Sequence, residues 1–507
     1  MASYFIYSAA FIGLEASRVS VETDIASGLP KFTIVGLPDT AISESRDRVR
    51  AAIRNSGLQF PRTRITLNLA PADIKKQGPS YDLPIALSIL LASGIVAAKQ
   101  ICHQTLFIGE LALDGTLRPV QGVLLAALLA KDIGVESIVV PYENAQEASL
   151  VKSIKVIPAN SLNEVILYLK GEHEIEPFVY KETTLTHTSV IDDMASIQGQ
   201  EQAKRTLEIT AAGGHNLLLS GPPGSGKTML ARSLPSILPT MTFDESLAVT
   251  KIRSVIASVS HHQKLVTQRP FRSPHHTSSS VSLIGGGAWP RPGEVSLAHQ
   301  GVLFLDEFPE FTRAAIENLR QPLEDGVVTI SRAAGTLEFP ARFMLVAAMN
   351  PCPCGFISDP DKACVCTPHQ VQRYSQKISG PVLDRIDLAV EVPRINFEKL
   401  TSTKENESSE IVRDRVEKTR EVQRRRYKDT KMSINAELHG GYLKRFCQLD
   451  EESNTLMKQA METMHLSARA FTRVLKVART IADLAGDEAL KINHLAEALQ
   501  YRPRAKE

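Results

Sequence analysis

The sequence predicts an α/β protein that ends in a helical domain. Short β-rich runs alternate with helical stretches from residue 4 to about residue 170, and a second alternating region runs from about residue 194 to residue 392. After Pro393 the chain becomes charged and helical, with long amphipathic patterns over residues 451–499. Alternating strand and helix signals are typical of α/β domains, and sustained amphipathic periodicity is typical of helices.

A chain of 507 residues is too long for one ordinary core, so several domains are expected. We predict an N-terminal α/β domain over residues 1–170 and a polar linker over residues 171–192, where no clear period is visible. An α/β core over residues 193–394 and a helical domain over residues 395–507 complete the chain.

The elements of the first domain follow from local composition. Short β-rich runs predict strands, and longer segments with helical periodicity predict helices. The predicted strands cover residues 32–36, 65–70, 107–113 and 137–141, and the predicted helices cover residues 39–55 and 83–94.

The composition, with 43% hydrophobic and 22% charged residues, is that of a globular protein. The net charge is only +2, so a nucleic-acid site would need a local concentration of basic groups. No run approaches the roughly 20 apolar residues that span a bilayer. Residues 1–11 also lack the positively charged flank of a signal peptide. We therefore expect a cytoplasmic protein with no membrane partner.

The second α/β region contains a glycine-rich segment directly after an apolar strand signal at residues 217–219. The segment consists of Gly221, Pro222, Pro223, Gly224, Ser225, Gly226, Lys227 and Thr228, and a helix-forming run follows from Met229. This order is the context of a P-loop, in which backbone amides and a helix N-terminus face the phosphates of a nucleotide. We expect Lys227 to neutralise the β- and γ-phosphates of ATP and Thr228 to hold Mg²⁺. The alternative is a glycine-rich turn without a ligand.

Two further apolar runs of this region end in polar residues. The run at 301–307 ends in Asp306 and Glu307, and the run at 343–350 ends in Asn350. In a P-loop enzyme the first carboxylate supports the Mg²⁺ ion and the second orients the attacking water, which indicates ATP hydrolysis. Asn350 would lie beside the γ-phosphate as a polar sensor. The alternatives are two acids that cap the next helix and a structural asparagine at a strand end.

Four of the six cysteines fall within fifteen residues, as the pairs Cys352, Cys354 and Cys364, Cys366. Four thiolates that a short loop brings together suit tetrahedral Zn²⁺ in a closed, structural site. His369 is a possible substitute ligand. Free thiols and disulfides are the alternatives, and a reducing compartment disfavours the disulfides.

Long sequence blocks identify a family resemblance. They cover residues 270–287, 291–311, 350–355, 379–392 and 467–486, and through them the whole chain resembles the ComM/YifB family of Mg-chelatase-like AAA+ ATPases. The resemblance implies a P-loop AAA+ core with a helical C-terminal lid. Arg385 matches the arginine finger that reaches the ATP site of a neighbouring subunit, and Arg473 matches the second sensor on the lid. A finger given to a neighbour implies a ring, which the resemblance makes a homo-hexamer.

The resemblance also implies a helix-2 insert near residues 280–296 and a hairpin at 326–340, which point into the central pore of related ring motors. The candidate DNA contacts are Trp289, Arg291 and Arg332, and the tryptophan could stack on a base. The alternative is that such charges are solvated or paired with acids. His275 and His276 belong to the family signature and have no assigned role. Other basic residues available nearby are Lys251, Arg253, Arg269 and Arg272.

Residues 75–84 and 107–141 resemble the proteolytic domain of Lon, which uses a serine and a lysine as a catalytic dyad. Ser80 falls at the place of the nucleophile, but Leu124 stands where the lysine is expected. A serine without its base stays protonated and weakly nucleophilic. We therefore expect a degenerate Lon-protease-like domain retained as a scaffold, unless Lys75 or Lys76 supplies the base.

The function that the resemblance implies is an ATP-driven hexameric DNA motor of the helicase type. Such a motor would act on single-stranded, duplex or branched DNA and drive branch migration in homologous recombination, natural transformation and competence. One alternative is the ATPase subunit of a magnesium chelatase, although the D-x-S-x-S signature of its partner's metal-binding domain is absent here. A second alternative is an AAA+ protein remodeller or chaperone.

Overall fold

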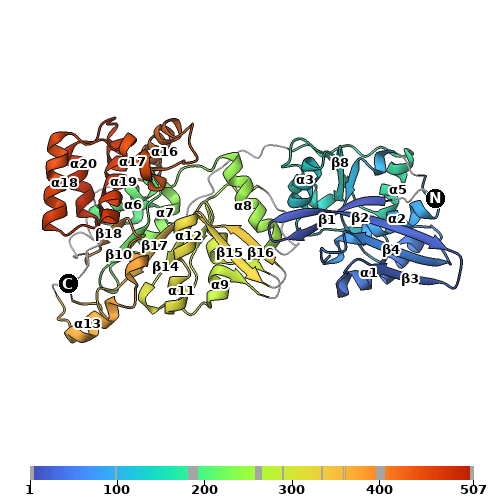
Figure 1. Ribbon diagram of the computed structural model, residues 1–507, viewed down its shortest axis with the longest axis horizontal. Helices are drawn as coiled ribbons and strands as arrows, with labels where there is room; N and C mark the ends of the chain where they lie inside the picture. Colours follow the sequence, from blue (N-terminus) through green and yellow to red (C-terminus); the bar gives the residue numbers. More distant parts are fainter. Residues whose placement is uncertain are drawn as a thin grey trace. The chain divides into compact units, whose positions relative to one another are not determined.

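The computed structural model describes residues 5–97, 100–180, 192–256, 265–287, 290–332, 335–357, 359, 361–395 and 406–502. The chain folds into two compact units, and both are of the predicted α/β class (Figure 1). The first unit comprises Met1–Leu185 and Phe243–Val266. The second comprises Thr186–Thr242 and Thr267–Glu507.

A seven-stranded sheet in the order β3-β4-β2-β1-β5-β8-β9 forms the centre of the first unit. Strand β2 runs antiparallel to both β1 and β4, and the remaining neighbours are parallel. The strands are β1 (Phe5–Ile12), β2 (Glu15–Ala26), β3 (Lys31–Val35), β4 (Arg64–Ala70), β5 (Thr105–Phe107), β8 (Ser137–Pro141) and β9 (Lys155–Ala159).

Helices cover both faces of this sheet. Successive side chains of a strand point to opposite faces, so Phe107 and Leu106 belong to two different buried clusters. The cluster around Phe107 is completed by helices α1 (Thr40–Asn55), α2 (Asp82–Ala92) and α5 (Leu162–Lys170). The cluster around Leu106 is completed by α3 (Val123–Asp132) and α4 (Ala145–Ala148).

Three predicted strands and both predicted helices of this unit are confirmed as β3, β4, β8, α1 and α2. The prediction of one strand over 107–113 is wrong. The backbone of Gly109 bonds to the start of α2: its N–H donates to Ser80 O, and its carbonyl accepts from Leu83 N. Strand β5 therefore ends at Phe107, and a separate strand β6 (Glu110–Leu111) pairs with β7 (Leu117–Arg118).

Helix α8 (Phe243–Ile256) packs in the first unit, although its sequence lies between two elements of the second. The Ser254 hydroxyl donates to Oε1 of the buried Glu147 at 2.5 Å, and its carbonyl accepts from Gly122 N at 3.3 Å. Leu247 packs against the cluster around Leu106. The sequence pattern of this helix does not indicate the unit in which it packs.

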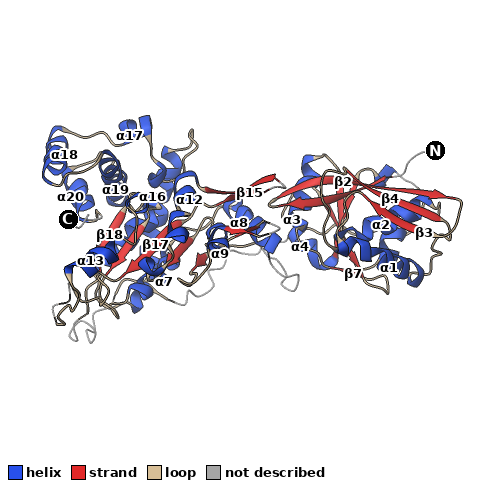
Figure 2. Cartoon of the chain, turned by 60° about the horizontal axis from the view of Figure 1, so that its bottom comes forward, coloured by secondary structure: helices blue, strands red, loops and turns tan. Residues whose placement is uncertain are grey.

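The second unit has a five-stranded parallel sheet in the order β11-β14-β17-β10-β18. Two of its strands, β17 and β18, are labelled in Figure 2. Helix α6 (Glu201–Gly213) and helix α7 (Lys227–Ile237) pack with it in one hydrophobic core that also includes the C-terminal helices. The strands are β10 (Leu217–Ser220), β11 (Phe271–Arg272), β14 (Val302–Leu305), β17 (Met344–Met349) and β18 (Leu388–Glu391).

Two short hairpin-like insertions interrupt this α/β core. The first contains α9 (Ser280–Ile284), the small ladder of β12 (Gly285–Gly286) with β13 (Arg291–Pro292), and α10 (Glu294–Leu297). The second is the hairpin of β15 (Val327–Arg332) and β16 (Gly335–Pro340), in the place expected for it. Other helices of the core are α11 (Arg313–Glu317), α12 (Arg320–Asp325), α13 (Pro368–Ser375) and α14 (Gly380–Leu383).

The C-terminal helices are α16 (Ser409–Arg426), α17 (Gly440–Phe446), α18 (Glu451–Thr463), α19 (Ala468–Ala485) and α20 (Ile492–Gln500). Helix α19 begins where the Ser467 side chain accepts a hydrogen bond from Ala470 N and ends at Gly486, whose positive φ of 76° suits glycine. Of the predicted linker, residues 171–180 are irregular and residues 181–191 lie outside the described ranges. Every helix within the described ranges is too short or too polar to span a bilayer.

The stability of the first unit should depend on pH through Glu147. Burial raises the pKa of this carboxyl, although Ser254, Leu124 N and Asn144 donate to it. Because the folded pKa lies above the ordinary value of 4.5, protonated Glu147 stabilises the fold; this contribution is complete below that value and is lost as pH rises through the folded pKa. As the pH rises from 4.5, we expect the free energy of unfolding to fall less for Glu147→Gln than for the wild type.

The measurement is the urea midpoint of unfolding, followed by circular dichroism at a series of pH values from 4.5 upward. Glu143→Gln changes an exposed neighbour and should keep the wild-type dependence on pH. Parallel midpoint curves for wild type and Glu147→Gln would contradict the prediction.

Candidate functional site

The glycine-rich segment lies between the end of β10 at Ser220 and the start of α7 at Lys227. Gly226, immediately before the helix, has a φ of 90°, which an L side chain rarely adopts. At Gly221 a Cβ atom would lie 2.1 Å from the Val392 carbonyl oxygen, so only glycine fits beside the end of β18. The loop therefore curls tightly over the N-terminus of α7, the arrangement that binds phosphate.

The Lys227 ammonium group spans this loop. It donates to the carbonyl oxygens of Gly221 at 2.7 Å and Pro222 at 2.9 Å, and it lies 3.3 Å from Asn350 Oδ1. The residue is 8% exposed, and burial lowers the pKa of Lys227 while the charge of Asp306 opposes this shift. A cation in this position can neutralise an anion that the loop binds.

The remaining polar groups of the site lie at the ends of the neighbouring strands β14 and β17. Asp306 directly follows β14, and its Oδ2 accepts a hydrogen bond from Thr228 Oγ1 at 2.8 Å. The Glu307 N–H donates to Asp306 Oδ1 at 2.9 Å, and Glu307 has a φ of 50°. Asn350 follows β17, the strand between β14 and β10. A hydroxyl and a carboxylate in contact form a ready pair of Mg²⁺ ligands, because Mg²⁺ prefers oxygen donors.

Glu307 also contacts a residue for which the sequence indicated no role. His276 Nδ1 lies 3.0 Å from Glu307 Oε2. The His276 ring packs at 4.2 Å from the His275 ring and meets Phe311 edge-on. The segment that carries both histidines follows β11, the edge strand next to β14.

The two predicted arginines contact the same short segment, residues 381–386. Arg385 donates to Pro381 O at 2.6 Å and forms an ion pair with Glu324. Arg473 on α19 donates to the carbonyl oxygens of Leu383 and Ile386 at 3.2 and 2.7 Å. The lid arginine therefore holds the segment on which Arg385 stands.

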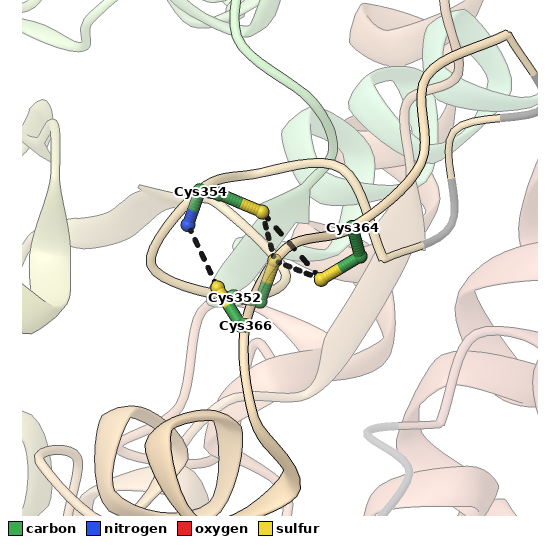
Figure 3. A group of neighbouring side chains, drawn as sticks. All are labelled: Cys352, Cys354, Cys364 and Cys366. Carbon is green, nitrogen blue, oxygen red and sulfur yellow. Dashed lines mark hydrogen bonds between the residues drawn. The ribbon is translucent and has the colours of Figure 1, made fainter.

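The four clustered cysteines converge after Asn350 (Figure 3). Their sulfur atoms all lie within 4.8 Å of one another, and the Sγ separations include 3.5 and 3.7 Å. Zn–S bonds of about 2.3 Å in a tetrahedron place sulfur atoms roughly 3.8 Å apart, so this donor set fits one zinc-sized ion. A Cβ atom at Gly355 would lie 2.4 Å from Pro223 Cδ, so the cysteine loop packs directly on the glycine-rich segment.

The candidate DNA contacts are only partly described. Arg291 is exposed on β13, Arg332 ends β15 with its side chain outside the described part, and Trp289 lies outside the described residues. Two other basic residues named with them are engaged elsewhere. Arg269 donates to Pro239 O and Gln300 O, and Arg272 pairs with Glu294 at 2.6 Å. Lys251 and Arg253 lie on α8, which belongs to the first unit.

The Lon-like positions do not form a dyad. Leu124 belongs to the buried cluster around Leu106, whereas Tyr81, next to Ser80, belongs to the cluster on the opposite face of the sheet. Lys76 is fully buried, and its ammonium group donates to the Pro71 carbonyl. The backbone N–H of Leu124 donates to Glu147, so this position serves the packing of the unit.

A parallel sheet that carries a glycine-rich loop, a threonine hydrogen-bonded to a strand-end aspartate and a strand-end asparagine defines a P-loop ATPase of the AAA+ class. Residues 193–400 match the family described as "Magnesium chelatase, subunit ChlI". Residues 21–144 match "Subunit ChlI of Mg-chelatase", and residues 406–502 match "Magnesium chelatase, subunit ChlI C-terminal".

Relatives that align with nearly the whole chain identify the family more narrowly. The chain is 44% identical over 504 residues to the protein YifB of Salmonella typhimurium, which covers 99% of this chain and 97% of the relative. It is 44% identical over 508 residues to the competence protein ComM of Haemophilus influenzae, which covers 99% and 98%. The chain belongs to the YifB and ComM family of magnesium-chelatase-like AAA+ ATPases. It is also 29% identical over 138 residues to Lon protease 2 of Bacillus subtilis, 26% of this chain and 24% of that protein.

Proposed function

We propose that this chain is the subunit of a hexameric, ATP-driven DNA motor of the helicase type, which promotes branch migration in homologous recombination and natural transformation. The observation that carries the proposal is the 44% identity to a competence protein over the whole chain, including both insertions and the lid. The contacts of Lys227 with Asn350 and of Thr228 with Asp306 support the ATPase part of the proposal.

Each residue of the site has a distinct task in this proposal. Lys227 would neutralise the β- and γ-phosphates, and Thr228 with Asp306 would hold Mg²⁺, which would supply further positive charge to the phosphates. Glu307 orients the attacking water, and Asn350 lies beside the γ-phosphate as a sensor. The backbone N–H groups of residues 224–229 bind the phosphates from the helix side, and Gly221, Pro222 and Pro223 shape the loop.

Arg385 supplies the finger to a neighbouring subunit. The side chain of its ion-pair partner Glu324 is 60% exposed, whereas that of Arg385 is 13% exposed, so only the carboxylate side of the pair faces the surface of the second unit. The Arg385 Nε atom is buried without a hydrogen-bond partner among the described residues. A guanidinium whose partner is exposed can exchange Glu324 for a phosphate of the adjoining subunit. Arg473 then acts through the segment that carries Arg385.

The exposed Arg291, together with Trp289 and Arg332 on the two insertions, is proposed to contact DNA in the pore of the ring. Arginine neutralises the phosphate backbone, and an aromatic ring stacks on bases of any sequence. Such contacts suit a motor, because translocation requires binding that does not depend on sequence.

A magnesium-chelatase subunit is the second candidate, because all three family matches carry that description. This candidate predicts that the protein, together with partner subunits, inserts Mg²⁺ into a porphyrin. A protein remodeller, the third candidate, requires ATP turnover that rises with unfolded protein rather than with DNA. Parallel ATPase assays with these three additions separate the candidates.

The first test is ATP turnover at fixed salt with and without single-stranded, duplex and four-way-junction DNA. We expect DNA to raise the turnover of the wild type and the protein to extend junctions. Lys227→Ala should lower turnover about 100-fold or more, the usual effect of removing a group that stabilises the transition state. Lys458→Ala, an exposed lysine on α18, is the matched control. If none of the DNA substrates changes the ATP turnover of the wild type, the motor proposal is wrong.

Mixing two inactive variants tests whether Arg385 acts on a neighbour. Lys227→Ala and Arg385→Ala should each be inactive as pure rings. In an equimolar mixture, about one quarter of the interfaces join an intact Lys227 to an intact Arg385 of the adjoining subunit. We therefore expect turnover to reappear on mixing. If Arg385 served its own subunit, no protomer of the mixture would be complete and the activity would stay absent.

We also propose that Cys352, Cys354, Cys364 and Cys366 bind one structural Zn²⁺. The ion would fix the loop that packs on Pro223 and so hold the shape of the phosphate-binding segment. Zinc here would supply structure only, since four protein ligands leave no open position.

Elemental analysis of protein purified without chelators should give one zinc per chain. Cys364→Ser should lose the metal and bind ATP more weakly, because the loop no longer supports Pro223. Cys447→Ala changes a buried cysteine outside the cluster and should keep the zinc. Zinc-free wild-type protein from metal-replete cells would contradict the assignment.

A further inference from the structure

Asn216 directly precedes β10 and contacts the segment that carries Arg385. Within the described part of the chain it takes part in five hydrogen bonds, which use its backbone N–H, its backbone carbonyl and both ends of its side-chain amide. Four of these bonds go to residues 385–388, and the fifth goes to Leu345 of β17. This half-buried residue therefore connects the sheet to the segment that carries Arg385.

The backbone bonds of Asn216 would form with other residue types at this position. Its carbonyl accepts from Asp387 N and Leu388 N, both at 3.0 Å, and these bonds begin the parallel ladder of β10 with β18. Its N–H donates to Asp387 Oδ2 at 3.2 Å. Every residue type except proline has both backbone groups, so these bonds do not explain an asparagine here.

The side-chain amide of Asn216 adds two bonds that depend on the residue type. Its Nδ2 donates to Arg385 O at 2.8 Å, and its Oδ1 accepts from Leu345 N at 2.8 Å. Because Leu345 N is a donor and Arg385 O is an acceptor, only this orientation of the amide satisfies both partners. A short side chain that donates at one end and accepts at the other is therefore matched to this position.

The bond to the Arg385 carbonyl fixes the backbone from which the guanidinium side chain departs. The Arg385 N–H also donates, at 3.0 Å, within the turn that precedes it, so the peptide groups on both sides of its Cα atom are bonded. Arg473 of the lid bonds instead to the carbonyl oxygens of Leu383 and Ile386. The lid thus holds the residues around Arg385, whereas Asn216 ties Arg385 itself to the sheet.

Strand β10 relates this tie to the nucleotide loop of the same subunit. Asn216 precedes the strand, and Gly221 follows it. The strand between them pairs with β17 along one side and with β18 along the other. The glycine-rich loop and the segment that carries Arg385 are therefore attached to opposite ends of one central strand.

We infer that Asn216 is a positioning residue that sets the direction of Arg385 for the ATP site of the adjoining subunit. The inference rests on the proposed function and deepens it, because it names the group of the sheet that orients the finger. Asn216 contacts the nucleotide of neither subunit in this scheme; it acts through the backbone of Arg385.

The first measurement compares Asn216→Ala with the control Asn454→Ala. Asn454 is an exposed asparagine of α18 whose amide also donates to a backbone carbonyl, that of Leu449. Asn216→Ala should lower kcat about tenfold, because a small displacement of a group that acts in the transition state is costly. Its affinity for a fluorescent ATP analogue should stay within about twofold, since its own glycine-rich loop is unchanged. The control should keep both values.

Mixed rings then show on which side of the subunit interface Asn216 acts. In the mixture of Lys227→Ala with Arg385→Ala, the first chain supplies every working finger and the second supplies every working ATP site. Asn216→Ala added to the Lys227→Ala chain should lower the recovered turnover about tenfold. Added to the Arg385→Ala chain, the same change should leave the turnover within about twofold of the parent mixture. A residue that only supported the fold would matter equally in both placements.

Asn216→Asp on the Lys227→Ala chain separates the two side-chain bonds. Aspartate keeps an acceptor for Leu345 N but has no N–H for the Arg385 carbonyl. We therefore expect it to lower the recovered turnover at least as much as alanine does. Full turnover with aspartate would show that the bond to Arg385 is dispensable and would overturn the inference. Equal losses, or equal retention, in the two placements of Asn216→Ala would overturn it as well.

Failure of the proposed function is visible separately. If the parent mixture recovers no turnover, Arg385 does not serve a neighbour, and the finger assignment fails together with this inference. If the parent mixture recovers turnover but the two placements behave alike, only the role of Asn216 is wrong. The motor proposal fails if DNA does not raise the turnover of the wild type, whatever the mixtures show.

Discussion

Hydrogen bonds between the ends of three neighbouring parallel strands hold the site together. Thr228 meets Asp306 at 2.8 Å, and Lys227 meets Asn350 at 3.3 Å, so the loop after β10 is tied to both β14 and β17. Polar groups at such strand ends face a crevice that backbone amides line, which is where ligands bind in open α/β sheets. The remaining features of the second unit either brace these strand ends or bring a further charge to them.

The Arg385 segment is braced from two directions. Asp387 accepts a hydrogen bond from Asn216 N and lies 3.3 Å from His215, at the start of β10. His215 is bonded in turn to Thr480 on α19, the lid helix that also carries Arg473. A guanidinium on a segment fixed by both the sheet and the lid loses little freedom when it binds a phosphate. Movement of the lid relative to the sheet would shift this segment.

Short sequence patterns predicted those parts of the fold and site whose residues are close together in the sequence. The P-loop residues, the strand-end carboxylates and the cysteine cluster each occupy a short stretch, and the structure brings each set together. Strands β1 and β2 escaped prediction, although Val19 and Val21 of β2 alternate with polar residues as a half-buried strand requires. That signal was available. No local pattern predicted the contact of His276 with Glu307. These residues follow two different strands, β11 and β14, and they meet only because the two strands are neighbours in the sheet.

The position of α8 could not be predicted, since its pattern indicates a helix but not the surface that it covers. The chain leaves the second unit after Thr242 and returns at Thr267. Both crossing points are anchored there: Thr240 N donates to Glu417, and Arg269 donates to Pro239 O at 2.7 Å, which joins the outgoing and returning segments. Within the first unit, Glu147 and the cluster around Leu106 hold that helix.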